Sequence, residues 1–156
     1  MSEMLTRRAV LAWCASLPLL AQEEAQQKDP WTEQSLMQPK DLAALLAGPA
    51  GSHPLLIHVG FPVLYRNAHI PGSVYAGPGA KPEGLAELKK AVANVPKDRE
   101  IVLYCGCCPM NRCPNLRPSF QQLSDAGYSR VKVLVIPTNL HTDWVTKGYP
   151  IEKPSA

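Results

Sequence analysis

Short apolar runs recur along the chain and predict buried β-strands. The runs lie at Leu55–Val59, Ile101–Tyr104 and Val131–Ile136, and Pro54, Gly60 and Pro137 bound the first and the third. Continuous apolar runs of this length are typical of strands that are covered on both faces of a sheet.

Amphipathic segments separate these strands and predict helices. In one of them, Leu85, Leu88 and Val92 recur at helical spacing, and Lys89 and Lys90 fall on the opposite face. The helical segments are expected at residues 39–48, 84–95, 116–126 and 139–147. Strands that alternate with short helices indicate an α/β fold with a central parallel sheet and helices on both of its faces.

The N-terminus has the pattern of an export signal. Arg7 and Arg8 precede an apolar run that ends near Leu20, and Ala21 offers a small residue for cleavage. The same arginine pair is similar to a twin-arginine signal. We therefore expect a signal peptide at 1–21, a polar linker at 22–32, one folded domain at 33–156, and an exported, periplasmic or extracellular location.

Composition fits a globular protein and gives no sign of a nucleic-acid partner. Apolar residues make up 46% of the chain and charged residues 19%, and the formal net charge is +3. Removal of residues 1–21 leaves 14 basic and 12 acidic residues, which is not the basic footprint that nucleic acid requires. No membrane span is expected once the signal is removed.

The most unusual feature is a cluster of cysteines in one loop. Cys105, Cys107, Cys108 and Cys113 lie within nine residues, whereas a disulfide framework joins distant segments. Reactive thiols or metal ligation explain such a cluster better. A disulfide within the loop, such as one between Cys107 and Cys113, is the alternative without chemistry, and the neighbours Cys107 and Cys108 are too strained to pair.

Cys105 is the expected nucleophile because it follows the second strand directly. In parallel sheets, ligands bind at the carboxyl ends of the strands. Backbone N–H groups and the helix that follows the loop favour a thiolate there, and Arg112 or Arg117 can stabilise it or hold an anionic substrate. Cys113 is the rival, because it precedes that helix.

Five segments, in order, resemble a single rhodanese-like domain. A strand at 55–60 is followed by a turn at 68–73, which resembles the family's "GHIPGA", and by the strand and cysteine at 101–105. The segment 125–134 resembles "aGFxxVxxL", and 144–150 resembles the terminal "W…GyP". The resemblance implies the α/β fold of that family with a catalytic cysteine at Cys105.

The resemblance also implies sulfur transfer. Cys105 would take sulfur from a small sulfur-donor anion as a persulfide and pass it to a thiol acceptor, with no cofactor. Cys107, Cys108 or Cys113 would resolve or modulate that persulfide. The candidate substrate-binding residues are Gly106, Asn111, Arg112, Arg117 and His58.

The chain departs from the family pattern around the cysteine. Its loop is longer than the family's and carries Met110 where an arginine is typical, and His58 and Gly60 stand where aspartate and arginine are typical. The expected active-site loop is therefore atypical, extended and cysteine-rich. His58 is either satisfied within the fold or a ligand or base, and His69 is expected to bind the local backbone.

Two other function classes remain open at the level of sequence. Cys105, Cys107, Cys108 and Cys113, with His58 nearby, can ligate a soft metal ion such as Cu(I) or zinc. The same thiols can exchange disulfides. A non-catalytic binding module on this scaffold is the third alternative, because a fold does not fix a function.

Overall fold

The computed structural model describes residues 28–153 and contains one parallel sheet. The expected signal peptide at 1–21 and residues 22–27 of the linker lie outside the described residues. The sheet has five strands in the order β1-β5-β4-β2-β3, and all neighbouring pairs are parallel. The strands are β1 (Leu36–Met37), β2 (Leu55–His58), β3 (Val74–Tyr75), β4 (Ile101–Tyr104) and β5 (Val131–Leu134).

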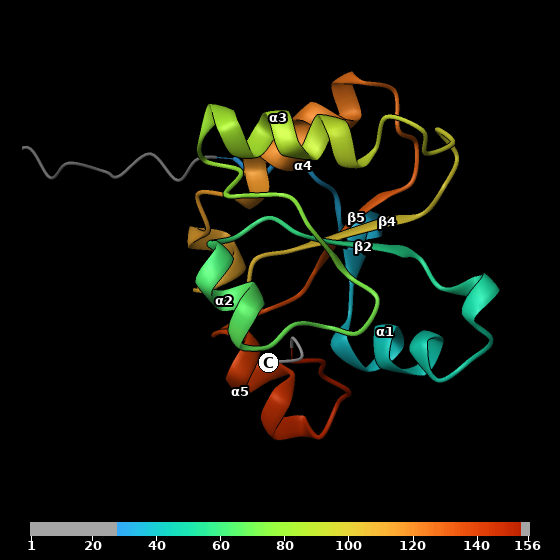
Figure 1. The fold of residues 1–156 in the computed structure, drawn as a ribbon, viewed down its shortest axis with the longest axis vertical. Coiled ribbons are helices and arrows are strands. Elements are labelled where there is room, and N and C mark those ends of the chain that lie inside the picture. The colour runs from blue at the N-terminus through green and yellow to red at the C-terminus, as the bar shows by residue number, and fades with distance from the viewer. Residues whose placement is uncertain (1–27, 154–156) are drawn as a thin grey trace, which may run out of the picture.

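Helices cover both faces of the sheet, as the alternating pattern predicts (Figure 1). In Figure 1, α3 and α4 lie together on one face, and α1 and α5 lie on the other. The short α2 lies at the carboxyl ends of the strands. The helices are α1 (Pro39–Leu46), α2 (Pro62–Asn67), α3 (Pro82–Ala91), α4 (Leu116–Asp125) and α5 (Leu140–Asp143), with 3-10 turns at 33–35, 50–52, 110–112 and 145–147.

Strand β5 ends at Leu134, two residues earlier than the apolar run Val131–Ile136 predicts. Val135 still donates a backbone hydrogen bond to Met37 at 2.9 Å, but the carbonyl of Ile136 accepts from Met110 in the cysteine loop at 2.9 Å. The end of this run therefore forms a hydrogen bond with the cysteine loop and no longer pairs with a neighbouring strand.

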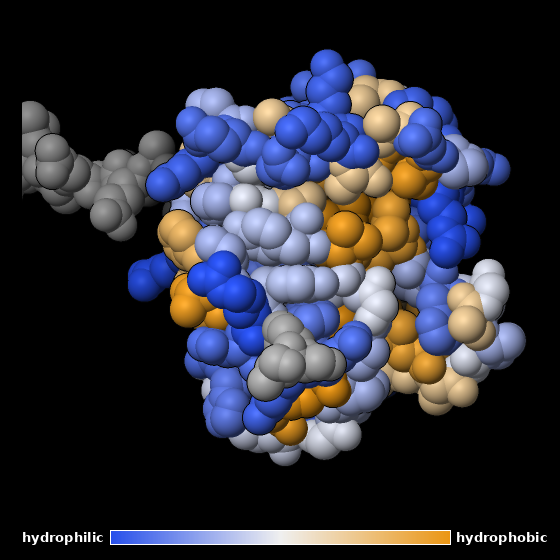
Figure 2. All heavy atoms as spheres, in the orientation of Figure 1, coloured by the Kyte–Doolittle hydropathy of each residue, from blue (hydrophilic) through white to orange (hydrophobic). Residues whose placement is uncertain are grey.

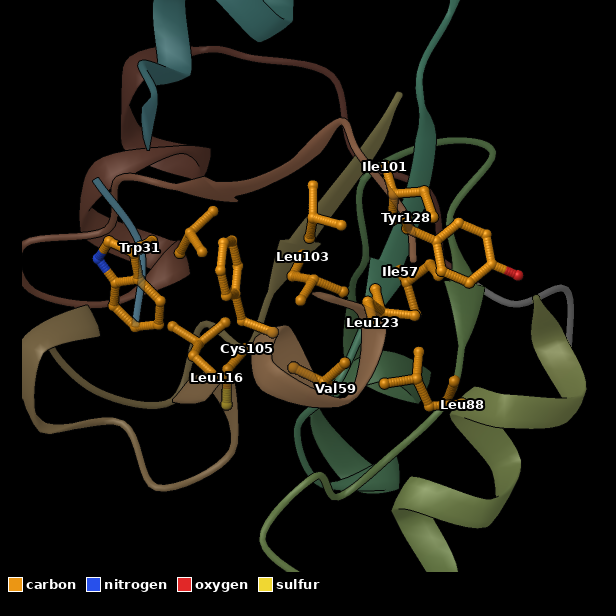
Figure 3. Close-up of a cluster of buried hydrophobic side chains, with 14 of the residues drawn as sticks. Trp31, Ile57, Val59, Leu88, Ile101, Leu103, Cys105, Leu116, Leu123 and Tyr128 are labelled. Atoms are coloured by element: carbon orange, nitrogen blue, oxygen red, sulfur yellow. The ribbon is translucent and has the colours of Figure 1, made fainter. Parts of the chain in front are cut away.

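Strand alternation divides the core into two layers, because successive side chains point to opposite faces. Leu103 and Cys105 belong to the layer under α3 and α4, whereas Val102 and Tyr104 belong to the layer over α1 and α5. Figure 3 shows Cys105 beside Leu116, at the end of the first layer that also holds Trp31. The fold thus gives Cys105 an apolar wall.

The N-terminal end of the described chain joins this core. Trp31, within the segment 22–32 expected as a linker, is 9% exposed and packs edge to face on Phe120, with ring centroids 5.6 Å apart. The surface of α3 that faces away from the sheet is mostly hydrophilic, as Figure 2 shows. None of the helices at 28–153 is long and apolar enough to cross a membrane.

His69 is held by the local backbone, as expected from its motif. Its Nδ1 lies 2.8 Å from the carbonyl oxygen of Tyr65, and its ring stacks on the Tyr65 ring at 3.9 Å. Backbone hydrogen bonds of 2.9 and 2.8 Å join His69 to Glu152. The predicted contact with the local backbone is confirmed.

Candidate active site

Strand β4 delivers Cys105 to the carboxyl edge of the sheet. The strand is fully buried, and Cys105, the next residue, is 2% exposed. The backbone of Gly60 lies against it, and a Cβ at Gly60 would stand 2.8 Å from the Cys105 sulfur. A larger residue at position 60 would therefore displace the sulfur.

Gly106 turns the chain out of the strand and fixes the start of the loop. Its φ is +79°, and a Cβ there would lie 2.7 Å from the Cβ of Leu140. Its carbonyl accepts a hydrogen bond from the Leu140 N–H at 3.0 Å. Only glycine combines this backbone conformation with this close approach to α5.

Three of the four loop sulfurs converge. The Cys105 and Cys107 sulfurs are 3.2 Å apart, and the sulfurs of Cys105, Cys107 and Cys113 all lie within 4.8 Å of one another. Cys108 lies beside the trio, 3.1 Å from Cys107. All four are free thiols, with Cys105 and Cys113 buried and Cys107 exposed.

The thiols around Cys105 hold their protons. A hydrogen bond with Cys105, reinforced by burial, raises the pKa of Cys113, and the N–H groups of Asn115 and Leu116 oppose this only in part. Burial raises the pKa of Cys107 to about 12 and also raises the pKa of Cys108. At neutral pH these three groups are therefore S–H donors, which is a poor state for a nucleophile.

Asn115 gives Cys105 a further donor. It is fully buried, its Nδ2 donates to the Cys105 sulfur at 3.4 Å, and its Oδ1 accepts from the N–H of Ala80 at 3.0 Å. The second bond fixes which end of the amide faces the sulfur. No pattern in the sequence singles out Asn115. Its only signal there is a polar residue between the last loop cysteine and the start of α4.

Among residues 28–153, neither Arg112 nor Arg117 makes a hydrogen bond to a loop thiol. Arg117 donates to the carbonyl of Asn111 at 2.6 Å and pairs with Asp29 at 2.7 Å. Arg112 and Asn111 are exposed on the 3-10 turn of the loop. Arg117 thus ties the loop to the N-terminal segment, and its guanidinium is engaged away from the sulfur cluster.

His58 is a buried neutral ring beneath Cys105. The point that a Gly60 Cβ would occupy lies 2.9 Å from His58 Cε1 as well as 2.8 Å from the Cys105 sulfur. His58 Nδ1 accepts from the Gly60 N–H at 3.3 Å, so the ring proton belongs on Nε2, which has no hydrogen-bond partner among the described residues. Burial, with a smaller contribution from His69, lowers the pKa of His58 to about 4.

A cleft of about 500 Å³ opens onto the cysteines. Cys105 and Cys107 line it together with the end of α2 and the start of α5. Of the two cysteines in the lining, Cys105 is nearly inaccessible and Cys107 is exposed. His141 is an exposed residue of its wall, and no motif around it in the sequence indicated this position.

Comparison with known proteins agrees with this architecture. The profile of the rhodanese-like domain matches residues 38–135. Similar solved structures include a protein from Bacillus halodurans, at 20% identity over 77% of each chain and a TM-score of 0.59. The Alr3790 protein from Anabaena sp. is 20% identical over 77% of this chain and 94% of its own, with a TM-score of 0.57.

A thiosulfate sulfurtransferase from Pseudomonas aeruginosa is also similar in structure. It is 19% identical over 78% of this chain and 20% of its own, with a TM-score of 0.56. At these identities the structural likeness establishes the fold. No curated protein matches the chain. Because the profile covers more than half of the sequence, the chain belongs to the rhodanese-like domain family.

Proposed function

We propose that the protein is a sulfurtransferase that forms a persulfide on Cys105 and passes the outer sulfur to a thiol acceptor. The observation that carries the proposal is the placement of Cys105. It follows the central strand directly, lines a cleft, and receives the side-chain amide of Asn115 as a fixed donor. Rigid placement of this kind favours a nucleophile.

The first step consumes a sulfane donor such as thiosulfate. The Cys105 thiolate attacks the outer sulfur of the donor, and a new S–S bond forms as the bond within the donor breaks. The electron pair of that bond leaves with sulfite. The persulfide sulfur then lies where the Asn115 Nδ2 and the neighbouring S–H groups can donate to it.

The second step moves the outer sulfur to the surface through Cys107. The Cys107 sulfur is 3.2 Å from Cys105 and is exposed, whereas Cys105 is almost inaccessible to an acceptor protein. Because Cys107 carries its proton at neutral pH, that proton passes to the Cys105 sulfur as Cys107 attacks the outer sulfur and Cys105 leaves. The transfer is therefore an exchange of a proton for a sulfur, with no net oxidation.

Cys113 is less suited to this relay. It is fully buried, and its hydrogen bond with Cys105 raises its pKa. We assign it the role of a donor that stabilises negative charge on the Cys105 sulfur. A role as the exit thiol would require a path to solvent that its burial denies.

Transient kinetics tests both steps. Wild-type protein mixed with thiosulfate should release a burst of one sulfite per chain, followed by turnover with a small dithiol. Cys105→Ser should abolish burst and turnover. Cys107→Ser should keep the burst and slow turnover, and Cys108→Ser is the matched control, which should keep both.

The proposal fails if Cys105→Ser retains the burst. Loss of the burst in Cys107→Ser would instead remove the relay and make Cys107 part of the first step. Oxidation of wild-type protein by the donor, with two hydrogens lost and no sulfur gained, would favour disulfide exchange over sulfur transfer.

We also propose that the protein acts after export, on the basis of the signal pattern at 1–21. N-terminal sequencing of the native protein tests this. A mature chain that begins close to residue 22 is expected, and a chain that begins at Met1 would contradict it.

A further inference from the structure

We propose that the sulfurs of Cys105, Cys107 and Cys113 form a three-coordinate site for Cu(I). The proposal uses thiols of the sulfur-transfer site, but binding of the ion does not require transfer to occur. Thiolates are soft ligands that select soft cations such as Cu(I). The sulfurs of three cysteines from one short loop already lie within 4.8 Å of one another.

The spacing of the sulfurs fits one ion among them. A metal ion about 2.3 Å from each sulfur, the length of a zinc–thiolate bond, holds three sulfurs in a plane about 4 Å apart. The three sulfurs lie within 4.8 Å of one another, with Cys105 and Cys107 at 3.2 Å. Adjustments of under about 1 Å, on the exposed Cys107 side, complete the triangle.

The surroundings favour three ligands over four. Structural zinc sites are closed by four ligands in a tetrahedron. Among residues 28–153, the convergent group contains only the three cysteines. The cluster that holds the two buried members also contains Val59 and Leu116, and Cys108 packs at its edge without joining the three convergent sulfurs. His58 Nδ1 is engaged by the Gly60 N–H. A three-thiolate set without a fourth ligand suits Cu(I) better than zinc.

Cys108 lies outside this site although it is a neighbour in the sequence. Its sulfur is 3.1 Å from Cys107, but it is not part of the convergent trio. The chain therefore supplies its own control, a loop thiol of the same kind that the ion does not need.

Occupation of the site has a consequence for the proposed sulfur transfer, on which this step rests. Cu(I) displaces the thiol protons and takes the lone pair with which Cys105 would attack a donor. Copper and sulfane sulfur are therefore mutually exclusive at Cys105. One equivalent of Cu(I) should suppress the sulfite burst, and a Cu(I) chelator should restore it.

Anaerobic competition with bicinchoninate, a chromophoric Cu(I) chelator, tests the site directly on the reduced protein. Wild-type protein should withdraw one Cu(I) per chain from the chelator. Since loss of a residue that only supports a metal site costs 10- to 100-fold in affinity, Cys107→Ser and Cys113→Ser should weaken binding by at least about 100-fold. Cys108→Ser should bind as the wild type does. X-ray absorption of the copper-loaded protein should give three sulfur neighbours.

Three outcomes overturn the proposal: no copper withdrawn by the wild type, equal loss in Cys108→Ser, or displacement of bound copper by equimolar zinc. If buried Cys113→Ser does not fold, as judged by circular dichroism, the surface variant Cys107→Ser still decides. The sulfite burst of copper-free protein is measured in parallel. A burst without copper binding defeats this proposal alone, and copper binding without a burst defeats the sulfur-transfer proposal alone.

Discussion

The four loop cysteines have the same side chain and different surroundings. Cys105 is at the end of a strand, Cys113 is packed in the core, and Cys107 and Cys108 are nearer the surface. Cys105 also differs from the rest in receiving a hydrogen bond from the side-chain amide of Asn115. These differences suggest a division into a nucleophile, a buried donor and an exit thiol.

Asn115→Asp should reduce the reactivity of Cys105. The substitution keeps the oxygen that accepts from Ala80 but replaces the Nδ2 donor with a negative oxygen facing the sulfur. Loss of a hydrogen bond to a charged group costs about 1.5–3 kcal/mol, so we expect alkylation of Cys105 to slow by about 10- to 100-fold.

Peptide mapping after timed alkylation measures that rate separately for each cysteine. Asn111→Asp is the matched control, because it adds the same charge to the same loop at an exposed position. Equal rates in the two variants would mean that the Asn115 amide does not activate Cys105.

His58 should make the stability of the fold depend on pH. Its pKa is about 4 in the folded protein against 6.5 for an ordinary histidine, so the unfolded chain binds one more proton between these values. The stability is complete above pH 6.5 and decreases as the pH falls toward 4, by about 3 kcal/mol in all. The cause is the cost of charging a buried ring.

Denaturant unfolding at several pH values checks this against His58→Leu. The leucine variant should lose the part of the pH dependence that lies between pH 6.5 and 4. The same slope in both proteins would show that His58 is not the titrating group.

At the scale of elements, the loop depends on contacts with the segment after β5. The Gly106 carbonyl accepts from Leu140 at the start of α5, and the Met110 N–H donates to Ile136. Arg117 holds the other end through Asn111. The backbone of the loop is therefore fixed at three places, and this keeps the thiols together.

Gly106→Ala should therefore disturb both stability and activity. A positive φ costs an alanine about 1 kcal/mol or more, and overlap with Leu140 adds about 1–3 kcal/mol. Gly72→Ala isolates the first effect, because Gly72 has a φ of +73° and open space around its Cβ position. We expect Gly106→Ala to be the less stable variant by denaturant unfolding and to lose most of its sulfite burst. Equal stability of the two variants would contradict the contact with α5.

The elements differ in how well the sequence predicted them, and length is the reason. The strands β2, β4 and β5 have long enough apolar runs to be recognised, and α3 and α4 have clear helical spacing. In contrast, β1 and β3 contain two residues each, and α2 contains six, so no periodicity can build up. The two short strands form because each pairs with a longer neighbour at an edge of the sheet, β1 with β5 and β3 with β2.

The site shows the same limit. The position of Cys105 directly after a strand indicated it as a site residue, because ligands of parallel sheets bind at the carboxyl ends of the strands. The positions of three further residues depend on how distant segments pack, and no local sequence pattern determines where their side chains point. These residues are Asn115, Arg117 and His141. Arg117 was expected near the substrate on the basis of proximity in sequence, and in the fold its guanidinium forms an ion pair with Asp29.

For the whole molecule, the central claim is that the sheet, the cleft and the cysteine loop together make Cys105 the atom that receives sulfur. The two core layers fix β4, and Cys105 and Cys107 both line the cleft. Mass spectrometry of the intact protein after exposure to thiosulfate, without reductant or metal, tests this most directly. Wild-type protein should gain one sulfur atom, located by peptide mapping on Cys105 or, after relay, on Cys107, and Cys105→Ser should gain none. A Cys105→Ser protein that still gains the sulfur, or a wild type that gains none, would contradict the account.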